Sequence, residues 1–67
     1  MAAAAHHREL TAAEVNQIAR VKQAESQFLG LLEDLALLHQ AAGPRERALA
    51  KTNIEQAAFW AVRSITR

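Results

Sequence analysis

The longest regular pattern of apolar positions in this chain runs through residues 11–42. Apolar residues recur there at alternating steps of three and four, which is the spacing of one face of an α-helix. The members of this ladder are Val21, Ala24, Phe28, Leu31, Leu35, Leu38 and Ala42. No proline interrupts the stretch before Pro44. The spacing predicts a helix over about residues 12–42, roughly 45 Å long at ~1.5 Å per residue.

The start of this helix carries a specific local signal. Thr11 and Glu14 have the spacing of a capping box, in which each side chain bonds the other residue's backbone amide. Leu10 and Val15 flank the box at the spacing of a hydrophobic staple. We therefore expect the helix to begin directly after Thr11, with residues 1–10 forming an N-terminal arm or a short helical turn.

The width of the apolar face changes along the predicted helix. In the first half the inward positions are Val15, Ile18 and Val21, and the rest of the circumference is polar. Over residues 28–38 the apolar arc is much wider than one partner helix can cover. This second half predicts that more than one neighbour packs against it.

A second helix is predicted after a tight turn at Gly43-Pro44. Glycine suits the left-handed position after a helix, and proline can be the first residue of the next one. The pattern predicts a helix over about residues 45–66, antiparallel to the first, with its seam at Ala50, Ile54, Ala57 and Ala61. Residues 57–62 are apolar on every side, so this segment must be surrounded. The fold class is all-α: a helical hairpin domain over residues 11–67, assembled as a homo-oligomer.

Size and composition support assembly and narrow the function. A chain of 67 residues with no cysteine cannot be stabilised by a disulfide, which leaves oligomerisation. The net charge of +1 gives little support for DNA or RNA binding. No apolar run approaches the ~20 residues of a membrane span. The N-terminus lacks the basic start of a signal peptide. A cytoplasmic location is the default expectation.

Catalytic chemistry has little support in the sequence. Glu33-Asp34 is best explained as a solvated helix face, and the chain has no glycine-rich phosphate loop. His6, His7 and His39 lack the spacing of a metal site. We expect a protein that is not an enzyme and that carries neither a metal nor a cofactor.

Four polar residues stand out as candidate ligand contacts: His7, Arg8, Thr11 and Lys22. A helix start offers free amides to a phosphate, and cations with an aromatic imidazole suit a nucleotide. For Lys22 a simpler explanation stays open, in which its stem covers apolar surface and its ammonium stays in water.

The same residues carry a family resemblance. The segment His7-Arg8-Glu9-Leu10-Thr11 is followed by Asn16, Lys22, Ala50-Lys51-Thr52, Gln56 and the final segment of residues 59–63. Over residues 7–67 this order resembles the anti-CBASS cyclic-oligonucleotide sponges, a family of small phage proteins. The aromatic position before Arg-Glu-Leu and the later lysine keep the family's separation here, as His7 and Lys22.

The resemblance implies a compact helical hexamer. It would bind cyclic dinucleotides made by the host's antiviral cyclases without cleaving them, and in some members cyclic trinucleotides at a separate site. His7 would replace a base-stacking tyrosine and Lys22 would stand for a ligand-contacting lysine. We expect Arg8 and Thr11, which the residue-level argument singles out, to complete the dinucleotide site. Lys51, with Thr52, would fall in the trinucleotide pocket.

Symmetry connects the resemblance with the residue-level argument. A cyclic dinucleotide has an approximate two-fold axis, as a homodimer does, so two copies of Lys22 can meet two phosphates.

Two other functions remain open. One is a small helical oligomerisation module that binds a protein partner through its leucine face, without a nucleotide ligand. The other is a nucleic-acid-binding hairpin, which the low net charge disfavours.

Overall fold

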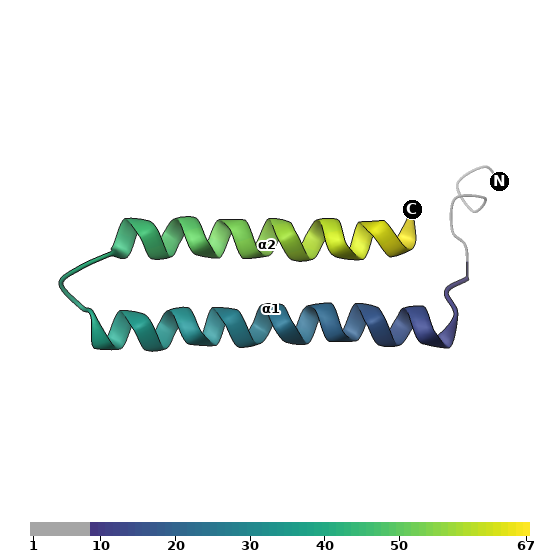
Figure 1. The fold of residues 1–67 in the computed structure, drawn as a ribbon, viewed down its shortest axis with the longest axis horizontal. Helices are drawn as coiled ribbons and strands as arrows, with labels where there is room; N and C mark the ends of the chain where they lie inside the picture. Colours follow the sequence, from purple (N-terminus) through teal and green to yellow (C-terminus); the bar gives the residue numbers. More distant parts are fainter. Residues whose placement is uncertain (1–8) are drawn as a thin grey trace.

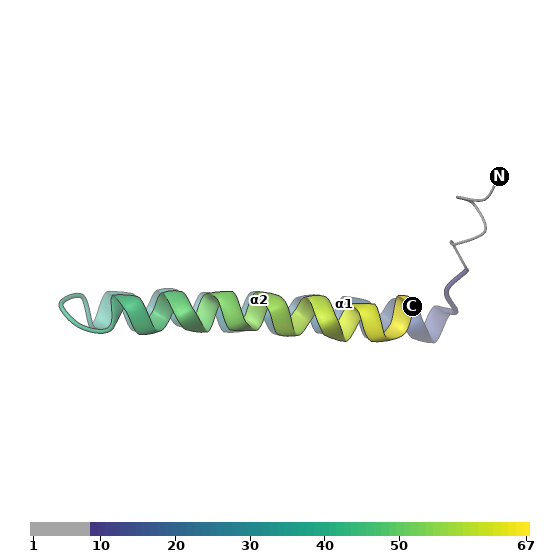
Figure 2. The same ribbon diagram turned by 90° about the horizontal axis from the view of Figure 1, so that it is seen from above.

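The structure, a computed structural model, describes residues 9–67 of the chain. Over these residues the chain forms an antiparallel hairpin of two helices, α1 (Ala12–Leu38) and α2 (Pro44–Thr66), and no strand. The helices run side by side, with the N-terminal end of α1 extending past the end of α2 (Figure 1), and the view from above shows them superposed as one narrow rod (Figure 2). The predicted all-α helical hairpin is therefore confirmed.

The N-terminal end of α1 has the predicted cap. The Thr11 hydroxyl accepts a hydrogen bond from the Glu14 amide at 3.1 Å, and the Glu14 carboxylate accepts one from the Thr11 amide at 2.9 Å. Together they satisfy backbone donors that have no partner inside the helix. The local sequence therefore sets where α1 begins.

The C-terminal end of α1 comes earlier than predicted. We expected the helix to continue to Ala42, but α1 ends at Leu38 and the connection takes up residues 39–43. The axes of packed helices lie about 8–10 Å apart, and helix–helix connections commonly take 2–8 residues. The predicted turn at residues 43–44 lies at the short end of this range, and the observed connection over residues 39–43 gives the chain more length to cross to α2.

Arg47 stabilises this connection from the first turn of α2. Its Nη1 donates to the Ala42 carbonyl oxygen at 2.6 Å and reaches the His39 carbonyl oxygen at 3.5 Å. Gly43 has a φ of 79°, the left-handed conformation that glycine adopts without a steric penalty. The guanidinium thus holds two carbonyl groups of the connection, of which the His39 carbonyl also accepts from the Ala42 amide at 3.2 Å.

The seam between the helices differs from the predicted ladder. The inner side of α1 carries the less exposed residues of the helix, which are Glu14, Ile18, Val21, Glu25, Leu29, Gly30, Leu32 and Ala36. Val21 is the one ladder member among them. Val15, predicted to face inward, is 54% exposed. On α2 the buried position is Ala58, and the predicted seam residue Ala57 is exposed.

The seam includes two glutamates because it must stay on one face along the whole helix. Positions 14, 18, 21, 25, 29, 32 and 36 follow each other at steps of four and three, so they form one continuous stripe. The purely apolar ladder shares Val21 with this stripe and, from Ala24 on, lies one position before it. Counting apolar residues alone therefore selected the wrong one of two adjacent stripes.

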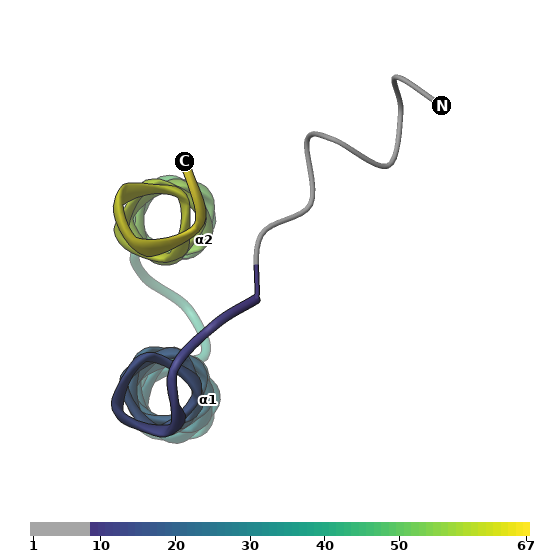
Figure 3. The same cartoon turned by 90° about the vertical axis from the view of Figure 1, so that its right-hand side faces the viewer.

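The other stripe lies on the surface of the hairpin. We call the residues Phe28, Leu31, Leu35 and Leu38 the outer stripe; their exposed fractions are 38%, 50%, 37% and 76%. On α2, Trp60 is 63% and Phe59 57% exposed, with their rings in an edge-to-face contact at 5.0 Å. The end-on view shows the two helices as a single layer of the described chain (Figure 3). Among residues 9–67 only Ala58 is buried, so the hairpin leaves most of its large apolar side chains uncovered.

Candidate functional site

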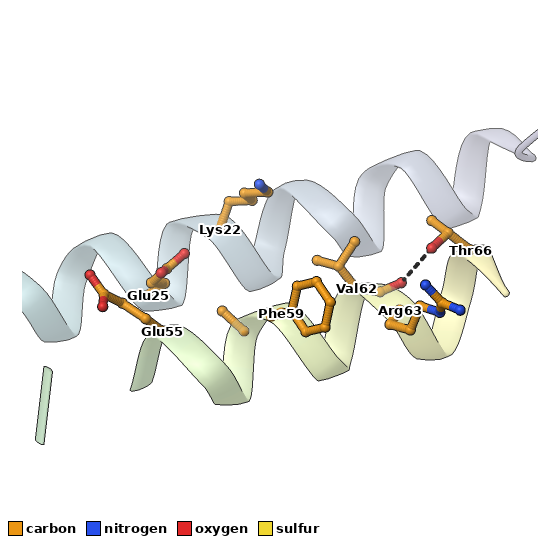
Figure 4. A pocket seen from close by; sticks show the side chains of 8 residues that line it. Lys22, Glu25, Glu55, Phe59, Val62, Arg63 and Thr66 are labelled. Carbon is orange, nitrogen blue, oxygen red and sulfur yellow. Dashed lines mark hydrogen bonds between the residues drawn. The ribbon is translucent and has the colours of Figure 1, made fainter. Parts of the chain in front are cut away.

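A groove of about 330 Å³ runs between the two helices near the open end of the hairpin. The side chains around it come from both helices: Lys22, Glu25, Glu55, Ala58, Phe59, Val62, Arg63 and Thr66. We call this hollow the Lys22 groove. It lies where the small side chain of Ala58 lets the helices approach closely, and Phe59 and Val62 form its apolar part (Figure 4).

The α2 wall of the groove follows from helical periodicity. Glu55, Phe59 and Arg63 recur every four residues, so they share one face of α2 at steps of about 6 Å along the axis. At the end of α2 the Thr66 hydroxyl donates to the Val62 carbonyl oxygen at 3.3 Å, which turns it back onto its own helix. The wall therefore presents a carboxylate, an aromatic ring and a guanidinium in order.

Charged side chains of both signs line the groove. Figure 4 shows the carboxylates of Glu25 and Glu55 toward one end and Arg63 toward the other, with the Lys22 side chain leaving α1 between them, on the side away from α2. Within residues 9–67 none of these four side chains takes part in a hydrogen bond or an ion pair. The groove thus presents two cations and two carboxylates to any molecule that enters it.

The predicted dinucleotide residues are placed as follows. Lys22 is exposed and lines the groove. Thr11 caps α1 and lies eleven positions earlier, about 16 Å along the helix axis, so one hairpin does not bring it to Lys22. His7 and Arg8 lie outside the described residues.

Lys51 and Thr52, the predicted trinucleotide pair, line different hollows. Lys51 lies with Glu33 and Arg47 beside a hollow of about 330 Å³ whose apolar side is formed by Leu29 and Leu32. Thr52 lines another hollow, of about 390 Å³, next to the rings of Phe59 and Trp60. A single hairpin therefore does not join the two residues in one site.

The groove also contains residues that the sequence argument did not single out. From the sequence, Glu25 and Glu55 have no assigned role, and Arg63 is named only as part of the family resemblance. These three residues carry three of the four charges of the groove. A signal in the sequence could have found them. Positions 55, 59 and 63 follow each other at steps of four, so they share one face of the second helix, and an antiparallel hairpin brings that face toward positions 22 and 25 of the first. Among the described residues no cluster of His, Cys, Asp or Glu has the arrangement of a metal site.

Comparison with models of protein families shows which family the chain belongs to. The family described as Acb2/Tad1, hairpin domain, matches residues 3–66, nearly the whole chain. The chain belongs to the Acb2/Tad1 family, the anti-CBASS sponges. The resemblance stated from the sequence is confirmed, and proteins of this family act by sequestering nucleotides and not as enzymes. Comparison with curated proteins and with solved structures gives no significant match.

The structure also bears on membrane association. In the described part of the chain, neither helix combines the length and the apolar character that crossing a bilayer requires.

Proposed function

We propose that this protein binds cyclic dinucleotides in the Lys22 groove and withholds them from a CBASS-type bacterial antiviral system without cleaving them. The observation that carries the proposal is the position of Lys22. The lysine that the family resemblance assigns to the ligand lines a groove together with a second cation and an aromatic ring. A two-helix hairpin alone would not require these three chemical groups to meet.

The side chains have distinct tasks in this proposal. The ammonium of Lys22 acts as a point charge for a phosphate, and the guanidinium of Arg63 can bind a phosphate through two parallel N–H donors. The exposed ring of Phe59 offers a surface for a base to stack on. Nothing in this set activates a water molecule or a nucleophile, so the ligand stays intact.

The arm completes the site in an assembled protein. His7 supplies the second stacking ring and Arg8 a further cation, as the resemblance implies. The Thr11 hydroxyl accepts a bond from the Glu14 amide and still has its own O–H to donate to a phosphate oxygen. Because Thr11 and Lys22 lie about 16 Å apart along one helix, the arm of a neighbouring copy is the better source of these groups.

Assembly is the second part of the proposal. We place the outer stripe and the ring of Trp60 against other copies of the chain, in a hexamer built as a trimer of dimers. The support is the large apolar side chains that the hairpin leaves exposed. A two-fold axis then brings two Lys22 grooves to one cyclic dinucleotide, and a three-fold axis can bring Lys51 and Thr52 of different copies to a cyclic trinucleotide.

The proposed site of action is the cytoplasm of a phage-infected bacterium, where the antiviral cyclases release their product.

A different function is favoured by one observation. The outer stripe could receive the helix of a foreign protein, which would make the chain a partner-binding module without a nucleotide ligand. Titration calorimetry with a panel of cyclic dinucleotides separates the two, because only a sponge gives saturable heat with the nucleotide alone.

A further inference from the structure

The carboxylates of the Lys22 groove need an explanation that phosphate binding does not give. Glu25 and Glu55 come from different helices and lie toward the same end of one hollow (Figure 4). Each would repel a phosphate, and each would also repel the other. Neither is engaged by a hydrogen bond or an ion pair within residues 9–67. This end of the groove therefore presents carboxylate oxygens that can accept hydrogen bonds from donors of a ligand.

The order of groups along α2 indicates where these donors lie in a ligand. From Glu55 the next turn brings the ring of Phe59, and the turn after it brings the guanidinium of Arg63, at about 6 Å per step. A base stacked on Phe59 would point one edge toward the carboxylates while its phosphate lies toward Arg63 and Lys22. The donors must therefore belong to the edge of a nucleobase.

Guanine and adenine differ in what they present on that edge. Guanine offers two adjacent donors, N1–H and N2–H, which match the two oxygens of a carboxylate. Adenine offers one donor, N6–H, next to the lone pair of N1. A carboxylate only accepts hydrogen bonds, so it gains two bonds from guanine and meets a repulsive lone pair on adenine. Uracil and cytosine present at most one donor position of this kind.

We infer that Glu25 and Glu55 select guanine, so that this protein takes guanine-containing cyclic dinucleotides in preference to those with adenine alone. The inference rests on the proposed function and adds its substrate class. A correctly paired base edge typically discriminates by roughly tenfold to a hundredfold in affinity. We expect the same ratio between cyclic di-guanylate and cyclic di-adenylate, with the mixed guanine–adenine ligand between them.

The test is titration calorimetry of the full-length protein with three ligands that share one phosphate linkage and differ only in their bases. The parent should bind cyclic di-guanylate roughly tenfold or more tightly than cyclic di-adenylate. Glu55→Gln keeps the shape of the side chain but replaces one acceptor oxygen by a donor, so the preference should shrink at least several-fold. Glu25→Gln tests the same end from α1. Circular dichroism confirms that each variant is folded.

The matched control is Glu46→Gln, which makes the same change of charge at an exposed position in the first turn of α2, away from the groove. It should keep the full guanine preference. Equal affinity of the parent for all three ligands would overturn the guanine inference and leave the sponge function intact. Absence of binding for all three would overturn the proposed function itself. A guanine preference that Glu25→Gln and Glu55→Gln both retain would show that other residues read the base.

Discussion

Lys22 is the residue on which the binding proposal depends most. It is exposed and lies on the edge of the groove, so the contact between the helices does not require it. Lys22→Glu reverses a charge facing the phosphates, and in a two-fold site it does so twice per ligand. We predict that the variant stays helical and oligomeric and loses cyclic-dinucleotide binding in calorimetry. Gln23→Glu, on the neighbouring exposed position, serves as the control and should bind like the parent.

The arm residue His7 gives a graded version of the same test. His7→Ala should weaken binding by roughly 1–3 kcal/mol, the usual contribution of a base–aromatic stack. His7→Tyr offers a larger ring and should bind as tightly as the parent or more tightly. If Lys22→Glu and His7→Ala both bind normally, the ligand lies elsewhere on the protein. If Lys22→Glu dissociates into monomers, Lys22 belongs to an interface.

Single residues were predictable from sequence to very different degrees. The predicted capping box of Thr11 and Glu14 is confirmed, because it is a local interaction between residues three positions apart. The environment of Lys22 was not predictable in the same way. Glu55 and Arg63 reach it only through the antiparallel register of α2, and that register depends on Ala58 being the close-contact position where Ala57 was expected.

Among the elements, the connection between α1 and α2 makes the sharpest test of the fold. An added Cβ at Gly43 would lie 3.2 Å from the Arg47 Nη1 atom, in a backbone conformation that disfavours side chains. Gly43→Ala should therefore lower the free energy of unfolding by about 1 kcal/mol. Gly30→Ala is the matched control, because its Cβ meets nothing within 4 Å in the middle of a helix. It should raise stability by about 0.5–1 kcal/mol.

Chemical denaturation in urea measures both variants. The prediction fails if the two alanine substitutions have effects of the same sign, because then the left-handed conformation of Gly43 does not make the connection depend on glycine. The helix lengths were predictable in part. The cap fixed the start of α1, whereas its end at Leu38 depends on the space needed to reach α2, which no local pattern contains.

At the scale of the whole molecule, the distribution of apolar side chains favours the proposed assembly. The sequence predicted an apolar arc too wide for one neighbour, and the hairpin leaves the outer stripe exposed. It could not predict which of the two stripes α2 covers, since both have helical spacing. The number of copies depends on contacts between chains. A hexamer is what the family resemblance implies.

Leu31 lies near the middle of the outer stripe and is 50% exposed on the hairpin. Leu31→Glu places a charge where another copy should pack, so light scattering should report a smaller species than the parent at equal concentration. Gln23→Glu adds the same charge on a polar part of α1 and should leave the mass unchanged. An unchanged mass for Leu31→Glu would show that the outer stripe does not hold the copies together.

Equilibrium dialysis followed by chromatography of the ligand tests the central claim most directly. The parent protein is dialysed against a cyclic dinucleotide containing guanine, and the bound nucleotide is then released by heat. We predict that the nucleotide accumulates on the protein side with a Kd on the order of 10 nM, about −11 kcal/mol, and is recovered entirely in its cyclic form. Equal concentrations on both sides of the membrane, or recovery of linear nucleotide, would contradict a sponge that binds without cleaving.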